Sequence, residues 1–170
     1  MTRRDCLSLL GVPALPAFGQ GVASRNVKPV ARGKPSGLPF RAQFTDIGRQ
    51  AGLAAPTIYG GVDQKLYILE VVGCGCAFFD YDNDGWLDVL VLCGTRLEGA
   101  PAEATNRLYK NNRDGTFTDV TEKTGLKRAG WASAVTIGDF DNDGHDDIFI
   151  TYFGQNVLYH NNGDGTFTDV

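Results

Sequence analysis

Histidine and cysteine are scarce in this chain of 170 residues, which has two histidines and four cysteines. The cysteines show neither the Cys-x-x-Cys spacing of zinc ribbons nor the Cys-x-x-Cys-His motif of covalent haem attachment. His145 and His160 have no recognisable nucleophile beside them, and Ser133 lacks the glycine context of a nucleophile elbow. The sequence therefore indicates no catalytic residue, and we expect that the chain is not an enzyme.

Positive charge and long apolar runs are also lacking. Sixteen Lys and Arg residues face twenty Asp and Glu, which gives a net charge of -4, so a nucleic-acid partner is not expected. The apolar run 7–19 has 13 residues and contains Pro13 and Pro16. A helix that spans a membrane needs about 20 residues, so we expect no transmembrane anchor.

That apolar run follows Arg3 and Arg4 and precedes small residues, which is the order of a cleavable export signal. The paired arginines resemble the twin-arginine type, although Cys6 stands where that pattern usually has Phe. An ordinary secretory signal or a disordered leader is the alternative. We expect a signal peptide at 1–23, a flexible lead-in at 24–43, and a periplasmic, cell-surface or extracellular protein.

Three cysteines remain beyond the expected signal peptide, at Cys74, Cys76 and Cys93. In an exported protein Cys93 can pair with Cys74 or Cys76 if a neighbouring strand brings them within reach. The alternative is that all three are small buried apolar residues.

The chain repeats itself. The segment 106–117 returns at 156–167, and the acidic segment 80–85 returns at 139–144. Similarity at a period of about 40–50 residues is typical of β-propeller blades. Within each unit, short β-branched and aromatic runs separated by Asp-Gly turns predict four antiparallel strands. The expected strands are 76–79, 87–93, 107–110 and 116–120 in one unit, and 134–137, 148–152, 157–160 and 166–170 in the other.

We therefore expect an all-β fold with about two propeller blades, in units of about 66–126 and 130–170, within a partial propeller at 44–170. The segment 44–53 resembles the end of a repeat and predicts a detached N-terminal strand, and 121–126 predicts one helical turn ended by Gly125. Propellers close with about four to eight blades, so a ring cannot close at this length. We expect a fragment of a longer protein, whose remaining part supplies the other blades.

Asp outnumbers Glu by 16 to 4, and nine Asp lie in the windows 80–88 and 139–147. In each window, carboxylates at positions 1, 3, 5 and 9 surround a glycine at position 6, and the carbonyl at position 7 can add an oxygen. Such hard oxygen ligands select Ca²⁺ or Mg²⁺ over zinc or copper, and flexible mixed carboxylate and carbonyl ligation favours Ca²⁺. The sequence predicts two Ca²⁺ sites, made by Asp80, Asp82, Asp84, the carbonyl of Trp86 and Asp88, and by Asp139, Asp141, Asp143, the carbonyl of His145 and Asp147.

An EF-hand shares the first half of this spacing but requires a Glu at position 12 between two helices. Val91 and Ile150 occupy that position here, in strand-like runs. An EF-hand is therefore excluded.

The two acidic windows resemble FG-GAP (VCBS-type) repeats, the calcium-binding blades of integrin α-chain propellers and of many secreted bacterial proteins. The intervening Asn-x-Leu-Tyr-x-Asn-Asn-x-Asp-Gly-Thr-Phe-Thr-Asp-Val motif is similar to the branch related to cartilage acidic protein, which often carries an ASPIC/UnbV domain. The resemblance covers roughly 44–170, and no region of the chain resembles that additional domain. It implies a structural role for Ca²⁺ in the loop between the first two strands of each blade.

Three functions remain open from the sequence. A calcium-stabilised module that binds a protein or glycan is favoured by the repeats. A larger propeller enzyme whose catalytic residues lie outside this chain is the alternative. Adhesion through the blade edges, with Trp86 and Tyr81 as anchors, is the third, although aromatic residues at such positions commonly pack between blades.

Overall fold

The computed structural model describes residue 37, residue 39 and residues 41–170. The predicted signal peptide and most of the predicted lead-in lie outside the described residues. Residues 44–170 form one compact unit, which is described by itself. No helix in the described part of the chain combines the length and the apolar character needed to span a membrane.

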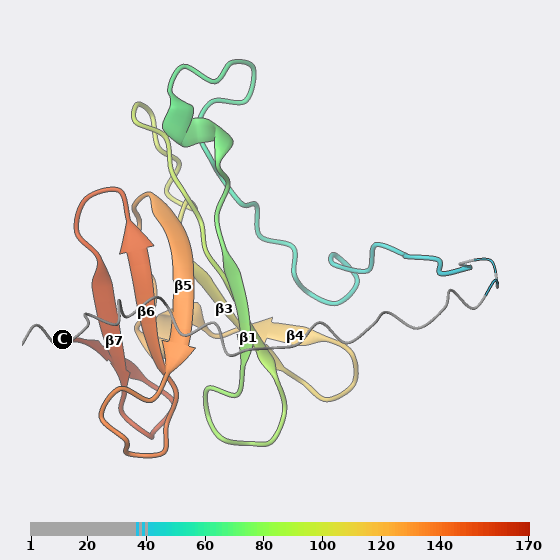
Figure 1. The fold of residues 1–170 in the computed structure, drawn as a ribbon, viewed down its shortest axis with the longest axis vertical. Helices are drawn as coiled ribbons and strands as arrows, with labels where there is room; N and C mark the ends of the chain where they lie inside the picture. The colour runs from blue at the N-terminus through green and yellow to red at the C-terminus, as the bar shows by residue number, and fades with distance from the viewer. Residues whose placement is uncertain (1–36, 38, 40) are drawn as a thin grey trace, which may run out of the picture. The chain divides into compact units, whose positions relative to one another are not determined.

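The compact unit contains two four-stranded antiparallel sheets, as the repeats predict. The strands of each sheet follow one another in chain order, β1-β2-β3-β4 and β5-β6-β7-β8 (Figure 1). The first sheet comprises β1 (Cys76–Phe79), β2 (Asp88–Val91), β3 (Arg107–Asn111) and β4 (Phe117–Asp119). The second comprises β5 (Ala132–Gly138), β6 (Asp147–Tyr152), β7 (Val157–Asn161) and β8 (Phe167–Asp169). The two sheets confirm the prediction of two β-propeller blades, each of four strands.

The observed strands coincide with the predicted ones to within a few residues. The differences are largest at β2, which ends at Val91, and at β5, which begins at Ala132 and pairs with β6 through a register shift between Ala132 and Ala134. Such a shift is a bulge that bends the strand locally. The helical elements are short, namely η1 (Ile68–Val71) and α2 (Thr121–Thr124). Gly125 ends α2 in the left-handed conformation, with φ 80°, as predicted.

The predicted N-terminal strand at 44–53 does not form. Residues 48–52 make a turn instead, and the side chain of Phe44 is 90% exposed. The turn still joins the first sheet at one point, because the N–H of Phe117 donates to the carbonyl of Ala51 at 2.7 Å. Gly52 permits this approach, since its φ is +88° and a Cβ there would lie 2.5 Å from the carbonyl oxygen of Phe117.

The hydrophobic core lies between the two sheets. Alternation within β6 turns Ile148 and Ile150 inward, while Phe149 between them is exposed. Leu90 of β2 and Leu108 of β3 supply the opposite side of the same cluster. Tyr152 adds a polar link, because its hydroxyl accepts a hydrogen bond from Nδ2 of the buried Asn106 at 2.6 Å. Both blades are thus needed to bury either set of side chains.

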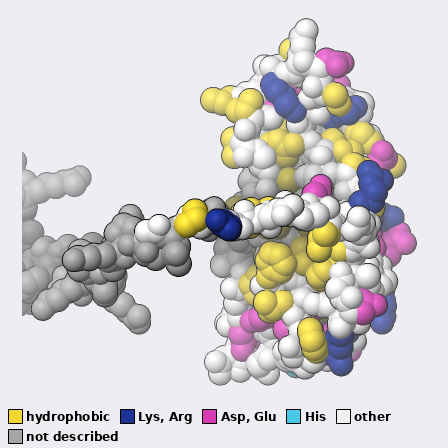
Figure 2. All heavy atoms as spheres, turned by 90° about the vertical axis from the view of Figure 1, so that its right-hand side faces the viewer, with side chains coloured by type: hydrophobic (Ala, Val, Ile, Leu, Met, Phe, Trp, Pro, Cys, Tyr) yellow, Lys and Arg dark blue, Asp and Glu magenta, His cyan; other side chains and the backbone are white. Residues whose placement is uncertain are grey.

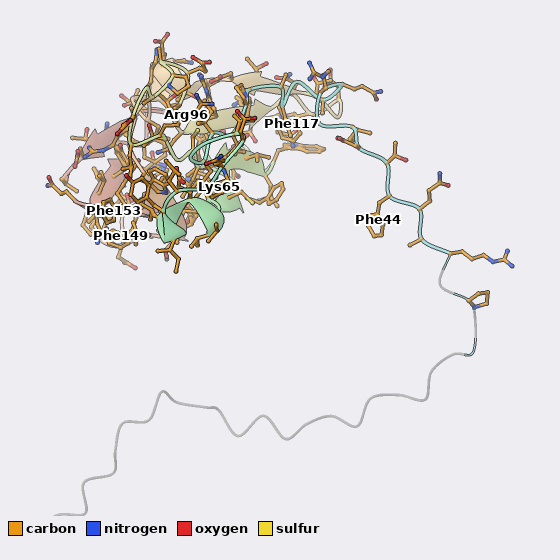
Figure 3. The ribbon with its side chains drawn as sticks, turned by 90° about the horizontal axis from the view of Figure 1, so that it is seen from above. Phe44, Lys65, Arg96, Phe117, Phe149 and Phe153 are labelled. Carbon is orange, nitrogen blue, oxygen red and sulfur yellow. The ribbon has the colours of Figure 1, made fainter. Side chains whose placement is uncertain are left out.

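Large hydrophobic side chains also reach the surface. They include Phe78 of β1, Phe149 of β6 and Phe153 just beyond β6. Phe149 and Phe153 lie on the second-sheet side of the molecule in Figure 3, and hydrophobic side chains stand between charged ones on the face in Figure 2. These side chains lie outside the core between the two sheets.

The three cysteines of the described part are free thiols. Cys93 is buried, Cys74 is half-buried and Cys76 is exposed. Neither disulfide considered from the sequence is formed, and only Cys93 matches the alternative of a buried apolar residue. Its Sγ accepts a hydrogen bond from the N–H of Ile58 at 3.2 Å.

Candidate metal centre

The two acidic loops connect β1 to β2 and β5 to β6, at the same end of the two blades, opposite η1 (Figure 1). Their backbones are held in the same way by the first Asp of each loop. Asp80 accepts from the N–H groups of Asp84 at 2.9 Å and Gly85 at 2.7 Å. Asp139 accepts from the equivalent residues, Asp143 at 3.1 Å and Gly144 at 2.9 Å. The Gly144 N–H is the main cause that lowers the pKa of Asp139.

The bend of each loop has positive φ at two residues, which are separated by one Asp. Gly85 and Gly144 have φ of 86° and 91°, and the residues two before them, Asn83 and Asn142, have φ of 54° and 63°. Asparagine and glycine tolerate this left-handed region best, which explains the shared Asp-Asn-Asp-Gly sequence. The local sequence therefore turns the flanking carboxylates toward one another.

The last Asp of each window is buried at the start of the second strand. Asp88 accepts from the N–H groups of Tyr81 at 3.3 Å and Asn111 at 2.7 Å, and Asp147 accepts from those of Phe140 at 2.9 Å and Asn161 at 2.7 Å. Burial raises the pKa of Asp88, and the N–H of Asn111 opposes that shift. Each carboxylate thus connects its acidic loop to the third strand of its own blade.

Among the described residues, three groups of side chains could hold a metal ion, each with ligand atoms within 4.8 Å of one another. The first loop brings together Asp80, Asp82 and Asp88, and Asp84 is not in that group. The second loop supplies two overlapping groups that share Asp141. One consists of Asp139, Asp141 and Asp143, and the other of Asp141, Asp147 and His160.

Trp86 and His145 are the residues at position 7 of the two acidic loops. Their N–H groups donate to the carboxylates of Asp84 at 3.0 Å and Asp143 at 2.8 Å. The predicted role of their carbonyl oxygens as ligands stays a prediction, because the three groups consist of side chains alone.

His160 is the site residue that sequence reasoning missed. Its Nδ1 lies 3.4 Å from a carboxylate oxygen of Asp141 and 3.3 Å from one of Asp147, and has no hydrogen-bond partner in the described part of the chain. The repeat could have indicated this residue. His160 aligns with Lys110, and both lie at the end of the third strand that is near the acidic loop.

Lys110 makes a different environment in the first loop. Its ammonium group forms an ion pair with Asp82 and lies 3.1 Å from Asp84, whose other cationic partner is Arg113 at 2.9 Å. The Arg113 guanidinium lowers the pKa of Asp84 to about 2, and the Asp82 carboxylate raises the pKa of Lys110. The two acidic loops therefore have the same backbone hydrogen bonds but differ in the charged side chains around them.

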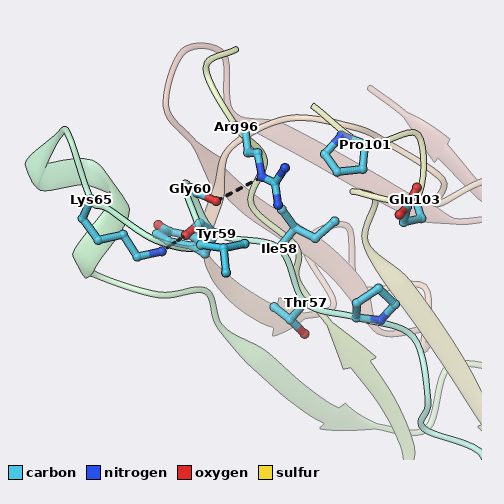
Figure 4. Close-up of a pocket in the computed structure, with 11 residues that line it drawn as sticks. Thr57, Ile58, Tyr59, Gly60, Lys65, Arg96, Pro101 and Glu103 are labelled. Atoms are coloured by element: carbon cyan, nitrogen blue, oxygen red, sulfur yellow. Dashed lines mark hydrogen bonds between the residues drawn. The ribbon is translucent and has the colours of Figure 1, made fainter. Parts of the chain in front are cut away.

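A cavity of about 510 Å³ lies at the other end of the first blade, between the segment 56–65 and the segment 96–103 (Figure 4). Lys65 and Arg96 line it, but Lys65 Nζ donates to the carbonyl of Tyr59 at 2.5 Å and Arg96 Nε to that of Gly60 at 3.3 Å. These cations hold the wall of the cavity together. The described lining contains neither a histidine nor a cysteine.

The sequence model of the FG-GAP-like repeat family matches residues 80–150 and 139–170. The match covers more than half of the chain, and both acidic loops lie within it. The chain therefore belongs to the FG-GAP-like repeat family. No curated protein matches it.

Proposed function

We propose that this chain is an exported calcium-binding β-propeller module that acts as a binding, adhesion or scaffold protein, with a structural role for Ca²⁺. The observation that carries the proposal is the group formed by Asp139, Asp141 and Asp143, whose carboxylate oxygens converge within 4.8 Å. Like charges at such spacing repel one another, and a divalent cation removes that repulsion.

Calcium suits this group better than magnesium. The three carboxylates sit on an exposed loop, and Ca²⁺ accepts irregular geometry and mixed carboxylate and carbonyl oxygens. Mg²⁺ requires near-octahedral ligation and gives up its water reluctantly. The carbonyl of His145, at position 7, stands in sequence where a further oxygen ligand is expected.

A structural role follows from where the loops are attached. The carboxylate of Asp147 belongs to the second group and also accepts the N–H of Asn161 in β7. A cation bound there would hold the β5–β6 loop against the third strand of the same blade. The partner, a protein or a glycan, would then bind a surface away from the loops.

The test is thermal unfolding of the purified protein in about 1 mM Ca²⁺ and in chelator. Weak extracellular sites have dissociation constants of about 10⁻⁴–10⁻³ M, so Ca²⁺ should add about 1 kcal/mol to the free energy of unfolding. Asp141→Asn should remove the part of the shift that the second loop contributes, while Mg²⁺ should give a smaller shift than Ca²⁺.

Asp146→Asn is the matched control, because it removes the same charge from the same loop at a residue outside both groups. It should retain the full shift. Absence of any Ca²⁺ shift in the unchanged protein would overturn the proposal, as would equal losses in both variants.

A further inference from the structure

In each blade, the β-hairpin beside the acidic loop presents residues to that loop. These residues differ between the two blades. In the first blade these are Lys110, at the end of β3, and Arg113, in the β3–β4 turn. Their counterparts in the second blade are His160 and Gly163. Each hairpin therefore determines which charges meet the carboxylates of its own loop.

Two permanent positive charges are placed on the carboxylates of the first loop. The Lys110 ammonium group contacts Asp82 and lies 3.1 Å from Asp84, and Arg113 Nη2 lies 2.9 Å from the same Asp84 oxygen. Lys110 is held further by the ring of Tyr81, with its Nζ 5.7 Å from the ring centroid. The ammonium group thus contacts the two middle carboxylates of the predicted ligand set.

The second loop has no such charges. Among the described residues, no Lys or Arg forms an ion pair with Asp139, Asp141 or Asp143. His160 approaches Asp141 instead, and Gly163 has no side chain to offer. A side chain at 163 would be strained, because its φ is +72° and a Cβ would lie 2.9 Å from Nε2 of His145.

Arg113 adopts an unfavourable backbone conformation in the position where the other blade has glycine. Its φ of 68° lies in the left-handed region that non-glycine residues avoid. The ion pair with Asp84 is an interaction that glycine could not make. Arg113 is therefore an unusual residue for this turn, and its side chain contacts the first acidic loop at Asp84.

We propose that Lys110 and Arg113 are built-in cations of the first acidic loop, so that the protein binds a single Ca²⁺, in the second loop. This inference rests on the proposed function and sharpens it, since the sequence predicts two equivalent sites. A Ca²⁺ ion entering the first loop must either displace the Lys110 ammonium group or bind beside it, and both raise its dissociation constant.

The experiment is equilibrium dialysis of the protein against Ca²⁺, with bound metal measured by atomic emission. The unchanged protein should bind one Ca²⁺ per chain. Asp82→Asn should retain that ion and Asp141→Asn should lose it. Lys110→His combined with Arg113→Gly gives the first blade the residues of the second, and should create a second site with at least about tenfold tighter binding in the first loop.

His160→Lys is the reciprocal variant, which should bring an ammonium group to the second loop and weaken its Ca²⁺ binding by at least about tenfold. Gln155→Lys is its control, because it adds the same charge in the exposed β6–β7 turn, at a residue outside both groups of the second loop, and it should retain the ion. If the double variant of the first blade fails to fold, Lys110→Gln alone provides the same comparison.

Binding of two Ca²⁺ ions with similar affinity by the unchanged protein would overturn this inference and leave the proposed function intact. So would a first loop that stays empty when Lys110 and Arg113 are both replaced in a folded protein. Binding of no Ca²⁺ at all would instead overturn the proposed function, and this inference with it.

Discussion

Asn161 of β7 donates a hydrogen bond from its side-chain Nδ2 to the carbonyl of Tyr81 at 2.9 Å. The two residues are buried and belong to different blades. Tyr81 is the second residue of the first acidic loop, and the same Asn161 side chain also binds the carbonyl of Asp146 in the second loop, at 3.1 Å. One amide group thus connects the two candidate metal loops.

Asn111 is the equivalent residue of the first blade and provides a matched comparison. Its side chain caps its own hairpin and binds the carbonyl of Leu87 at 3.0 Å, but makes no bond to the other blade. Because a buried carbonyl left unpaired costs about 1–3 kcal/mol, Asn161→Ala should reduce the free energy of unfolding by that amount more than Asn111→Ala. Urea denaturation in chelator measures both, and equal losses would show that the bond between blades contributes nothing.

The core between the sheets can be tested with two leucines of the same segment. Leu90 is 0% exposed in the cluster between the blades, and Leu87 is 56% exposed at the end of the acidic loop. Leu90→Ala should lower the free energy of unfolding by about 2–5 kcal/mol through lost burial and the cavity it leaves. Leu87→Ala should change it by less than about 0.5 kcal/mol.

A large loss in both leucine variants would mean that Leu87 is covered in solution by something other than the described residues. A small loss in both would contradict the packing of the two blades against each other. The comparison therefore tests the arrangement of the sheets and not only their existence.

The repeats made most of this architecture predictable. Each acidic loop and each Asp-Gly turn marks the end of a strand, so the positions of these loops and turns predict the eight strands. The carboxylate groups follow as well, because the Asn-Asp-Gly bend forces neighbouring Asp side chains together. For this reason Asp80 and Asp139 accept equivalent hydrogen bonds, each from the backbone N–H groups four and five residues later.

What could not be predicted depends on contacts between segments. The spacing within 80–88 shows four carboxylates but not that Lys110 and Arg113 reach two of them from another hairpin. His160 was missed for the same reason. The segment 44–53 resembles a repeat end, yet it forms a turn, since a strand requires a neighbouring edge with which to pair.

Low pH should destabilise the segment 61–70, whose backbone is bonded to the Glu70 carboxylate. This buried carboxylate accepts the N–H groups of Leu66 at 2.5 Å, Tyr67 at 3.1 Å and Gly61 at 3.2 Å. These bonds, with that of Tyr67 first, lower the pKa of Glu70 from its ordinary value of 4.5. A lowered folded-state pKa means that the stabilisation is present above the unfolded-state pKa and is lost as the pH falls through the folded-state one.

We therefore expect the free energy of unfolding to fall more between about pH 6 and pH 3 in the unchanged protein than in Glu70→Gln. Urea denaturation at several pH values in chelator measures this difference. Glu98→Gln is the control, because Glu98 is exposed and its side chain makes no hydrogen bond within the described chain. The idea fails if Glu70→Gln and the unchanged protein lose stability in parallel.

The three thiols of the described chain should differ in reactivity. Cys76 is exposed on β1, whereas Cys93 is buried, with its Sγ 3.2 Å from the Ile58 nitrogen. Burial raises the pKa of Cys74, which reduces the fraction of reactive thiolate.

A maleimide should therefore label Cys76 first, Cys74 more slowly, and Cys93 only when the protein unfolds. Peptide mass spectrometry of samples taken along a labelling time course gives the order directly. Cys76→Ser should remove the fast phase and leave the other two rates unchanged, because the exposed thiol makes no hydrogen bond in the described structure. Labelling of Cys93 at the rate of Cys76 in the folded protein would show that the segment around Ile58 opens readily, and would contradict its packing on the first blade.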